Sequence, residues 1–367
     1  MGKDLKYLLG LSFIDAVGAA TAGRLLSAFH SPQAIFDAGL TELAAAGEIS
    51  VSKARRIKEF DSWDKVDAEI ERAANNNIRI ITPFDGEYPE SLSHIDGAPT
   101  LLYLKGGLIA EDRFALAMVG SRNMSEYGRK AASDLSYELA LSGITIVSGM
   151  ARGIDTASHK GALKAQGRSI AVLGCGLDKC YPPENQKLMS DLSESGCVIS
   201  EFPLGTPPLR ENFPRRNRLI SGLSLGVLVV EATTRSGSLI TARFALEQGR
   251  EIFAVPGNIT SSNSDGTNSL IKRGAKPVQT AQDVLEEMSS QIKGLLRSVK
   301  ATRHSAERLE INEEEKAICN VLGSGSKHID NISRELRIPA ARLSGLLLGL
   351  EMKGMIRQTA GNNFSIL

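Results

Sequence analysis

Three arginines stand close together in one short stretch of this sequence. The segment "NFPRRNRLISGLS", residues 212–224, sets Arg215, Arg216 and Arg218 beside Phe213. Arginine offers a planar fork of donors that suits phosphate oxygens, and an aromatic ring can stack on an unpaired base. The stretch is therefore either a solvated loop or part of an anion-binding site. Because the whole chain carries a net charge of only +1, any positive surface must be local.

A second segment, "AMVGSRNMSEYG", combines glycine and arginine in a turn. An apolar run ends before Gly120, Ser121 and Arg122 follow in the turn, and Ser125 suits the N-cap of a helix. Arg122 and the N–H groups at the helix start could bind a phosphate oxygen. A tight turn with a solvated arginine is the equally open alternative.

The segment "SGMARGIDTASHKGAL", residues 148–163, repeats the order of strand, glycine turn and helix, with the helix starting near residue 154. Arg152 adds positive charge to the turn, and we expect Asp155 to bond the local backbone. We interpret His159 as a polar structural residue, because a lone histidine near a helix start is more often structural than catalytic.

A proline-rich loop follows in "LGCGLDKCYPPENQKL", residues 173–188. Tyr181 precedes two prolines, and Lys187 lies a few residues beyond them. A stiff loop that holds an exposed aromatic ring suits base stacking, while an ordinary rigid turn is the alternative.

The last such loop lies in "EATTRSGSLITARFALEQGR", residues 231–250. Ser236, Gly237 and Ser238 form a turn, and Thr241 falls in the first turn of the following helix. We expect Glu231 to orient a neighbouring arginine, because no second acidic group of suitable spacing supports a catalytic role. Between residues 205 and 250, seven arginines oppose three glutamates. One such loop is usually solvated, but four at one sheet edge favour a binding site.

The segments that must position these loops alternate between strand and helix from residue 113 to about 284. Short apolar runs recur as "ALAMVG", "ITIVSG", "SIAVLG", "CVIS", "GVLVVE" and "EIFAVPG". Continuous apolar strands indicate burial on both faces, and hence a parallel sheet flanked by helices. The sequence predicts an α/β fold with an extended Rossmann-like, doubly wound, mostly parallel sheet. Such sheets bind ligands at the carboxyl ends of their strands.

Composition and periodicity divide the chain into four parts. Residues 1–75 read as short helices, resembling a sterile-alpha-motif or helix–hairpin–helix bundle, and residues 76–285 form the Rossmann-like domain. Residues 286–310 are a mixed-charge linker with some helical content. Residues 311–367 predict three helices and a hairpin, the pattern of a winged helix.

The third helix of that last unit, "PAARLSGLLLGLEMKG", is unusual for a DNA reader. It offers only Arg342 and Lys353 among mostly apolar residues. A helix that reads the major groove normally carries Arg, Asn or Gln. We therefore favour a protein-interaction or regulatory role for this unit.

Several function classes find no support in the sequence. A hydrophobic share of 42% and a charged share of 23% describe a globular protein. The four cysteines form no CxxC pair and have no histidine cluster beside them, so we expect no metal site. The P-loop and the GxGxxG motif with its following acid are absent, and we expect no cofactor. No signal peptide and no run of about 18 apolar residues is present, so we expect a cytoplasmic protein that does not contact the membrane.

Taken together, seven motifs resemble the DprA/Smf family of bacterial DNA-processing proteins. They are "GSR" at 120–122, "SGMARGID" at 148–155, "GLDKCYPPEN" at 176–185, "NFPRRNRLISGLS" at 212–224, "SGSLITA" at 236–242, "AVPGN" at 254–258 and "GTNSLIKRGA" at 266–275. The resemblance covers residues 78 to 284, and the flanks agree with longer family members.

The resemblance implies a protein that binds single-stranded DNA and is not an enzyme. It also implies a homodimer that helps to load the RecA recombinase during natural transformation and recombination. With the loops above, we expect DNA contacts from Gly120, Ser121, Arg122, Arg152, Lys187, Asn212, Phe213, Arg215, Arg216, Asn217, Arg218, Ser236, Gly237, Ser238 and Thr241. Cationic loops would neutralise successive phosphates and give a steep salt dependence.

Two other readings remain open. Nucleotide phosphoribohydrolases of the lysine decarboxylase-like fold also place glycine-rich turns at strand ends, although their PGGxGTxxE signature is missing here. A winged-helix transcription regulator with a nucleotide-sensing central domain is the second alternative. The weakly basic third helix argues against it.

Overall fold

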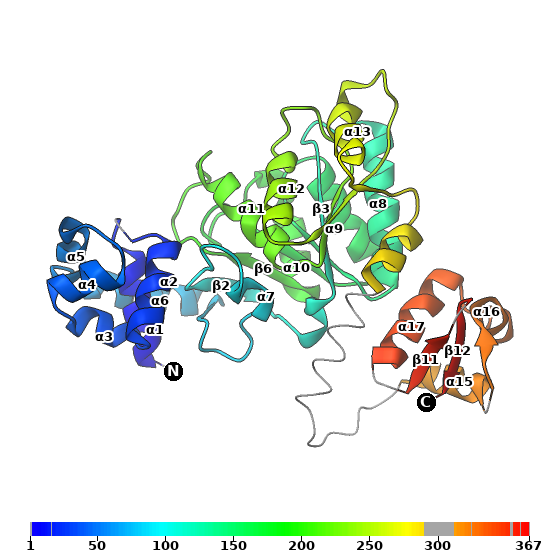
Figure 1. The fold of residues 1–367 in the computed structure, drawn as a ribbon, viewed down its shortest axis with the longest axis horizontal. Coiled ribbons are helices and arrows are strands. Elements are labelled where there is room, and N and C mark those ends of the chain that lie inside the picture. The colour runs from blue at the N-terminus through cyan, green and yellow to red at the C-terminus, as the bar shows by residue number, and fades with distance from the viewer. Residues whose placement is uncertain are drawn as a thin grey trace.

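The structure is a computed structural model that describes residues 2–15, 17–289, 312–323, 325–352, 355–359 and 361–366. Six helices form a bundle at the N-terminal end: α1 (Gly2–Ser12), α2 (Ala19–Phe29), α3 (Pro32–Asp37), α4 (Leu40–Ala46), α5 (Val51–Lys58) and α6 (Trp63–Asn75) (Figure 1). Apolar residues at helical spacing, such as Leu8, Leu25 and Ile57, are fully buried in its interior. Tyr7, Phe36, Phe60 and Trp63 pack ring against ring beside them.

The central sheet contains nine strands in the order β1-β2-β6-β5-β4-β3-β7-β8-β9. The strands are β1 (Arg79–Ile81), β2 (Leu102–Gly106), β3 (Ala115–Val119), β4 (Thr145–Ser148), β5 (Ser169–Val172), β6 (Cys197–Ser200), β7 (Gly226–Val229), β8 (Glu251–Ala254) and β9 (Lys276–Pro277). The six apolar runs of the sequence are β3 to β8, and all of them pair in parallel. β1 and β2 extend the sheet with antiparallel pairing. The mostly parallel sheet expected from the sequence is thus confirmed.

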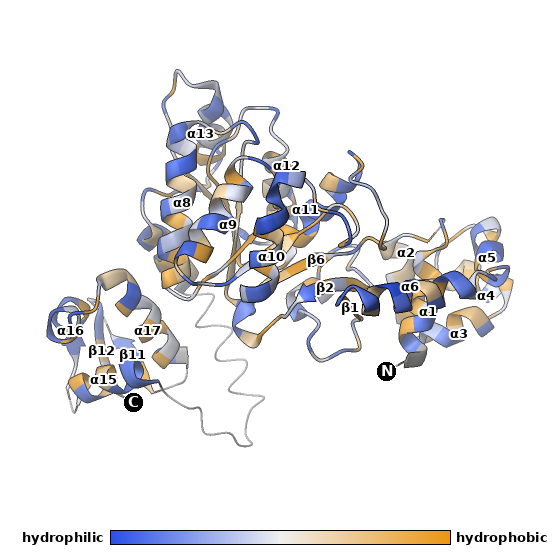
Figure 2. Cartoon of the chain, turned by 180° about the vertical axis from the view of Figure 1, so that it is seen from behind, coloured by the Kyte–Doolittle hydropathy of each residue, from blue (hydrophilic) through white to orange (hydrophobic). Residues whose placement is uncertain are grey.

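Helices cover both faces of this sheet. They are α7 (Glu90–Ser93), α8 (Glu126–Leu141), α9 (Ile154–Lys164), α10 (Gln186–Ser195), α11 (Asn212–Gly222), α12 (Ser238–Glu247) and α13 (Asp265–Lys272), with 3-10 turns at Ala110–Arg113, Pro183–Asn185 and Ser262–Ser264. Alternate residues of β3 face opposite layers: Ala117 packs with α11 and α12, whereas Leu116 packs with α8 and α9. Burial on both faces explains why the strands read as continuous apolar runs, which Figure 2 shows in orange.

The N-terminal bundle is fastened to the sheet through α6. Arg72 forms an ion pair of 2.5 Å with Asp178, in the loop that follows β5. Glu69 accepts a hydrogen bond of 2.7 Å from the backbone N–H of Leu204, in the loop that leads to α11. Because Glu69 is buried, this contact stabilises both loops against the bundle.

A winged helix forms the C-terminal unit, as the sequence predicts. It comprises α15 (Glu313–Leu322), β10 (Lys327–His328), α16 (Ile329–Leu336), α17 (Ala340–Met352), β11 (Ile356–Thr359) and β12 (Asn363–Ile366). Ile318, Ile332 and Leu343 are fully buried in its small core. Residues 286–289 of the expected linker are helical, and the rest of that linker lies outside the described residues. Within the described ranges, no helix has the length and apolar character needed to cross a bilayer.

Candidate nucleic-acid interface

A cleft of about 890 Å³ opens at the carboxyl ends of β3, β4 and β7. Its walls come from the turn after β3, the turn after β4, the first half of α11 and the loop between β7 and α12. These are four of the segments that the sequence singles out, separated by up to about a hundred residues along the chain. Parallel strands bring them together, because their carboxyl ends share one edge of the sheet.

The turns after β3 and β4 are locked to each other. The N–H of Ile154 donates to the carbonyl of Ser121 across 3.1 Å, and the N–H of Ser121 donates to the carbonyl of Glu231 across 2.8 Å. Gly153 has a φ of +77°, and a Cβ at this position would overlap the Ser121 carbonyl. Only glycine fits both the left-handed backbone and the close approach. The position of Arg122 is therefore set by three strand ends together.

Phe213 stands at the centre of the cationic side of the cleft. The Arg122 guanidinium carbon lies 5.1 Å from its ring centroid. Tyr181 packs against the same ring at a centroid distance of 5.6 Å and an interplanar angle of 42°. A guanidinium and two aromatic rings thus lie side by side, as a site for both phosphate and base requires.

Arg216 is buried beneath this surface and does not project into solvent. Its side chain donates to the carbonyls of Gly149, at 2.7 Å, and Val172. Burial lowers the pKa of Arg216 to about 10, while the neighbouring carboxylate of Asp155 opposes the shift. This placement argues against the expected direct DNA contact: one terminal nitrogen bonds two strand-end carbonyls, and Nε donates to the side-chain oxygen of Asn217 across 3.2 Å.

Asp155 lies below the same turn and bonds the local backbone, as the sequence predicts. Its carboxylate accepts a hydrogen bond of 3.3 Å from the N–H of Ala151. Desolvation raises the pKa of Asp155, against the opposing effect of Arg216. His159 is fully buried, with Nδ1 2.7 Å from the Ser169 hydroxyl, so it serves the packing of α9 on the sheet.

Two other expected contacts also prove to be inward-facing. Arg218 forms an ion pair with Glu201, and both side chains are largely buried. Asn212 is 4% exposed and lies at the start of α11, with its amide 3.5 Å from the carbonyl of Pro207. Neither residue lines the cleft. The helical period of α11 turns them towards the interior, where Arg218 meets Glu201 and Asn212 meets Pro207, while Nη1 of Arg218 has no hydrogen-bond partner among the described residues.

The remaining expected residues divide between the cleft and its surroundings. Arg215 is exposed outside the cleft, with its guanidinium over the Phe202 ring at 5.2 Å. Arg152 is exposed and paired with Glu184, and Lys187 is exposed on α10. Expected residues that line the cleft are Gly120, Ser121, Arg122, Phe213, Arg216, Asn217, Ser236, Gly237, Ser238 and Thr241.

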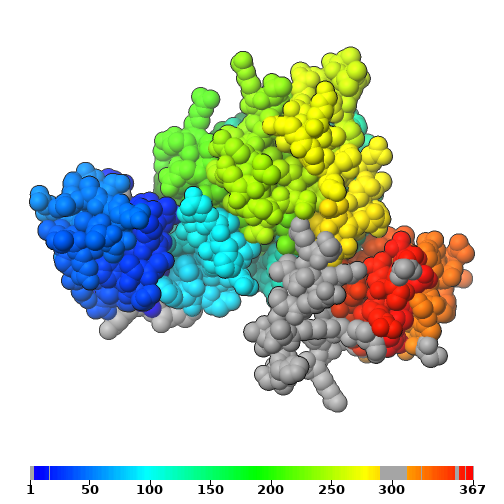
Figure 3. Space-filling model, viewed as in Figure 1, coloured from blue at the N-terminus to red at the C-terminus, as the bar shows by residue number. Residues whose placement is uncertain are grey.

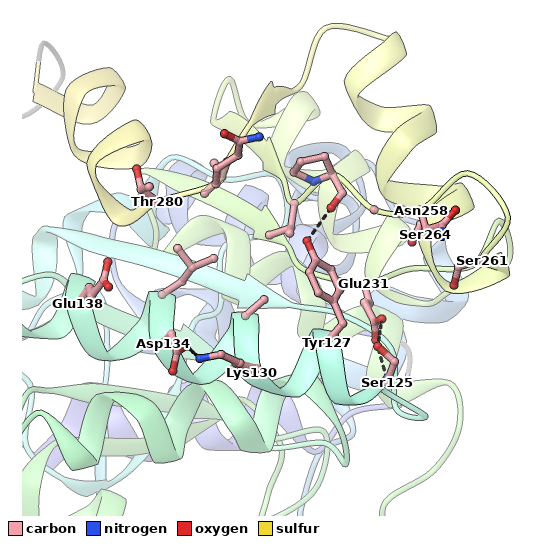
Figure 4. A pocket seen from close by; sticks show the side chains of 17 residues that line it. Ser125, Tyr127, Lys130, Asp134, Glu138, Glu231, Asn258, Ser261, Ser264 and Thr280 are labelled. Atoms are coloured by element: carbon pink, nitrogen blue, oxygen red, sulfur yellow. Dashed lines mark hydrogen bonds and ion pairs between the residues drawn. The ribbon is translucent and has the colours of Figure 1, made fainter.

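Glu231 caps α8 instead of orienting an arginine. Its buried carboxylate accepts hydrogen bonds from the N–H of Ser125, at 2.8 Å, and from the Ser125 hydroxyl. Ser125 is the N-cap, and its hydroxyl accepts from the N–H of Gly128 at 3.0 Å. Figure 4 shows this contact at one end of α8. The helix start that the sequence offers to phosphate is thus already occupied by a protein carboxylate.

A second cavity of about 900 Å³ lies beyond this contact (Figure 4). Tyr127 stands in its wall and donates to the carbonyl of Pro256 across 2.8 Å. Its charged lining consists of Lys130 with Asp134, which pair at 2.5 Å, and the carboxylates of Glu138 and Glu231. The excess of negative charge makes this cavity unsuitable for phosphate.

The cleft itself is lined by four guanidinium groups and one buried carboxylate, that of Asp155. The sequence-based list omits Arg210 and Arg235, although both count towards the local excess of arginine. With Arg122, they form no salt bridge within the part of the chain that the structure describes. Asn123 and Asn263 were missed because they meet only in the fold, where Asn263 lies 3.4 Å from the Asn123 carbonyl.

The fold and site define an α/β protein with a cationic, aromatic cleft at the carboxyl edge of a parallel sheet. No group of three or more metal-binding side chains occurs among the residues described. The family model for DNA recombination-mediator protein A matches residues 79–289. The DprA winged helix domain matches residues 301–362, and a SAM-like helix-hairpin-helix tandem matches residues 8–60. The chain belongs to the DprA/Smf family of DNA-processing proteins.

Individual relatives agree with this assignment. The chain is 42% identical to protein Smf of Escherichia coli, over 77% of this chain and 76% of the relative. It is 47% identical to DNA processing protein DprA of Streptococcus pneumoniae, over 55% of this chain and 72% of the relative. The crystal structure of the pneumococcal protein superposes with a TM-score of 0.67 and 37% identity, covering 77% of this chain and 96% of that one.

DNA processing protein A of Helicobacter pylori is a further structural neighbour. It has a TM-score of 0.52 and 28% identity, and the match covers 58% of this chain and 96% of that one. That structure is described as showing a single-stranded DNA binding mode.

Proposed function

We propose that this protein binds single-stranded DNA in the cleft at the ends of β3, β4 and β7, and that it does so without catalysing a reaction. The observation that carries the proposal is the group of guanidinium groups that line the cleft beside Phe213 without a salt bridge. Arg122 lies over the Phe213 ring, and Arg122, Arg210 and Arg235 all line the cleft and form no salt bridge within the described residues. Phosphates would take that place, with the release of counterions.

The aromatic rings explain the expected preference for a single strand. Tyr181 and Phe213 lie in a cleft between loops, where the bases of a duplex, stacked and paired, cannot reach them. An unpaired base that stacks on one ring gains about 1–3 kcal/mol, with little dependence on its identity. The turn at Ser236 to Ser238 adds hydroxyl and N–H groups to the lining of the cleft. Binding is therefore expected to be tight at low salt and tolerant of sequence.

We further propose that the protein acts as a dimer in the cytoplasm and helps to load RecA on single strands during transformation and recombination. Membership of the family supports this role, and the single-stranded DNA binding of the Helicobacter pylori relative supports its first step. A mediator must hold the strand without base-specific contacts, so that a recombinase can take it over. A site built on phosphate charge and stacking meets that need.

Fluorescence anisotropy tests the binding proposal. A labelled poly-dT oligonucleotide and a duplex of equal length are titrated with the full chain at low and at moderate salt. We expect tighter binding of the single strand and a clear loss of affinity as salt rises. Tighter binding of the duplex, or no binding of either, would refute the proposal.

The mediator role has a separate test. RecA filament formation is followed on single-stranded DNA coated with single-strand-binding protein, with and without the full chain. Faster filament formation supports the mediator role. If the chain binds single strands but does not speed the filament, DNA binding stands and mediation fails.

A nucleotide-processing enzyme remains the alternative, because a cleft of this size at strand ends could also hold a nucleotide. The carboxylates near the strand ends argue against hydrolysis: Asp155, which lines the cleft, is buried under the turn, and Glu231, which lies outside the cleft, is engaged by Ser125. Incubation with nucleoside monophosphates, followed by chromatography for free base, decides between the two. Release of base above a buffer control would favour the enzyme.

A further inference from the structure

We infer that α17, the third helix of the winged-helix unit, is a docking helix that seats this unit on the carboxyl end of α8. This assigns an intramolecular partner to the helix that in winged-helix proteins is placed to read DNA. The inference does not depend on the DNA-binding proposal, because it concerns a different surface of the molecule.

The contact is close enough to involve the backbone of both helices. A Cβ on Gly345 of α17 would lie 2.6 Å from the Cα of Ser142 and 3.0 Å from the carbonyl oxygen of Leu141. Ser142 is buried, and its hydroxyl is shared between the carbonyls of Glu138, at 3.0 Å, and Ala341, at 3.1 Å. Helices approach this closely only where the contact residue has no side chain.

An apolar contact continues the interface along α17. Leu348 packs against the core layer that contains Leu139 and Leu285 of the central domain. In Figure 3 the red surface of this unit adjoins the yellow surface of the segment before residue 290. Leu343, Leu347 and Leu350 of α17 are buried in the core of the unit itself, so Leu348 is the apolar side chain that α17 adds to the central domain.

The arginine of α17 also forms an ion pair within the winged-helix unit. Arg342 pairs with Glu314 of α15 at 2.9 Å. While the unit is docked, the face of α17 around Gly345 and Leu348 is covered by the central domain, and the exposed Arg342 guanidinium faces a carboxylate. The winged helix is therefore held as a protein-docking module.

The interface has features of a contact that can open. A cavity of about 320 Å³ remains between the two units, so their surfaces are not fully complementary. Glu286 on the central side and Asp330 and Glu351 on the winged-helix side line it. Like charges on the two sides of one cavity oppose docking, and salt screens them. We expect the docked fraction to rise with salt, opposite to the effect of salt on DNA binding.

Two glycines of α17 provide a matched test. A Cβ on Gly349 would meet only the Glu315 carboxylate, at an ordinary contact distance of 3.5 Å, within the winged-helix unit itself. Gly345→Ala and Gly349→Ala make the same chemical change in the same helix, but only the first obstructs α8. Both substitutions should raise the intrinsic helix propensity of α17 by a similar amount, because each replaces glycine by alanine.

The full chain and both variants are compared by small-angle X-ray scattering and by hydrogen exchange. We expect the wild type and Gly349→Ala to be equally compact, with the amides of residues 142–144 protected. Gly345→Ala should have a larger maximum dimension and exchange at these amides about tenfold faster. Unchanged protection of Ile318 and Leu343 in the winged-helix core shows that the unit still folds. Identical scattering and exchange for the two variants, or an extended wild type, would overturn the inference.

Discussion

The guanidinium of Arg216 donates to the carbonyl of Gly149 across 2.7 Å, and through this bond α11 holds the turn that follows β4. The same side chain also reaches the carbonyl of Val172, at the end of β5. A cation within the most arginine-rich motif of the chain thus supports the floor of the cleft from below. It ties α11, which carries Phe213, to the turn after β4, and that turn is itself bonded to the Arg122 turn through Ile154 and Ser121.

Replacement of Arg216 should reduce stability more than replacement of its neighbour. Arg216→Met leaves two buried carbonyls without donors, and we expect a loss of about 2 kcal/mol in the free energy of unfolding. Arg215→Met removes only an exposed guanidinium over Phe202 and should cost less than about 1 kcal/mol. Urea denaturation followed by circular dichroism measures both. Equal losses would mean that the buried contacts of Arg216 contribute nothing measurable.

Arg122 and Arg152 form a matched pair for DNA binding. Arg122 lines the cleft, whereas Arg152 lies outside it and pairs with Glu184. Arg122→Ala should weaken binding of poly-dT about tenfold and reduce the slope of log K against log salt by about 0.7, as for one lost phosphate contact. Arg152→Ala should leave both quantities nearly unchanged. Anisotropy titrations over a salt series test this, and the reverse order of effects would place the DNA elsewhere.

Gly153 and Gly237 should respond differently to the same change. A Cβ on Gly153 would overlap the Ser121 carbonyl in a backbone of φ +77°, whereas Gly237 has nothing within 4 Å of its Cβ position. We expect Gly153→Ala to lose more than about 1 kcal/mol of stability and to weaken DNA binding, because it displaces the Arg122 turn. Gly237→Ala should keep stability. Thermal unfolding measures the stability of both variants, and anisotropy measures their DNA binding. Wild-type stability and DNA affinity in Gly153→Ala would contradict the locking of the two turns.

His159 should make the fold sensitive to mild acid. Burial, reinforced by the charge of Arg216, lowers the pKa of His159 from 6.5 to about 3. Below pH 6.5 the imidazole of His159 binds a proton in the unfolded chain but stays neutral in the folded protein. The free energy of unfolding therefore falls as pH decreases towards 3. The loss approaches about 1.4 kcal/mol per pH unit within that window.

His159→Asn provides the comparison for this pH dependence. The Ser169 hydroxyl donates to the carbonyl of Ile146, so it accepts from Nδ1 of His159, and an asparagine amide can replace that donor. The variant should lose stability less steeply between pH 6.5 and 4.5 than the wild type. Asp155 is present in both proteins, so its titration does not account for the difference. Urea midpoints at a series of pH values measure the difference. Parallel curves would show that His159 does not titrate in this way.

Much of the architecture follows from local sequence patterns. Continuous apolar runs predict the parallel strands β3 to β8, and glycine at their ends predicts where a ligand site belongs. Ser125 was recognisable as an N-cap because the capping bond joins residues three apart. The order of the motifs was enough to indicate the family. These features depend on interactions between residues close together in the chain, so they can be predicted from a single sequence.

The roles of individual arginines depended on partners far away in the chain. Arg216 falls on the same helical face as Leu219 and Ile220, but an arginine can be buried there only because the carbonyls of Gly149 and Val172 accept its donors. Likewise, the carboxylate of Glu231 reaches the start of α8 from the end of β7, which no local pattern announces. From the chain alone, one can predict that cationic loops gather at one sheet edge. Which side chains face the cleft follows only from the folded protein, because burial of a charge depends on acceptors that distant segments bring into contact.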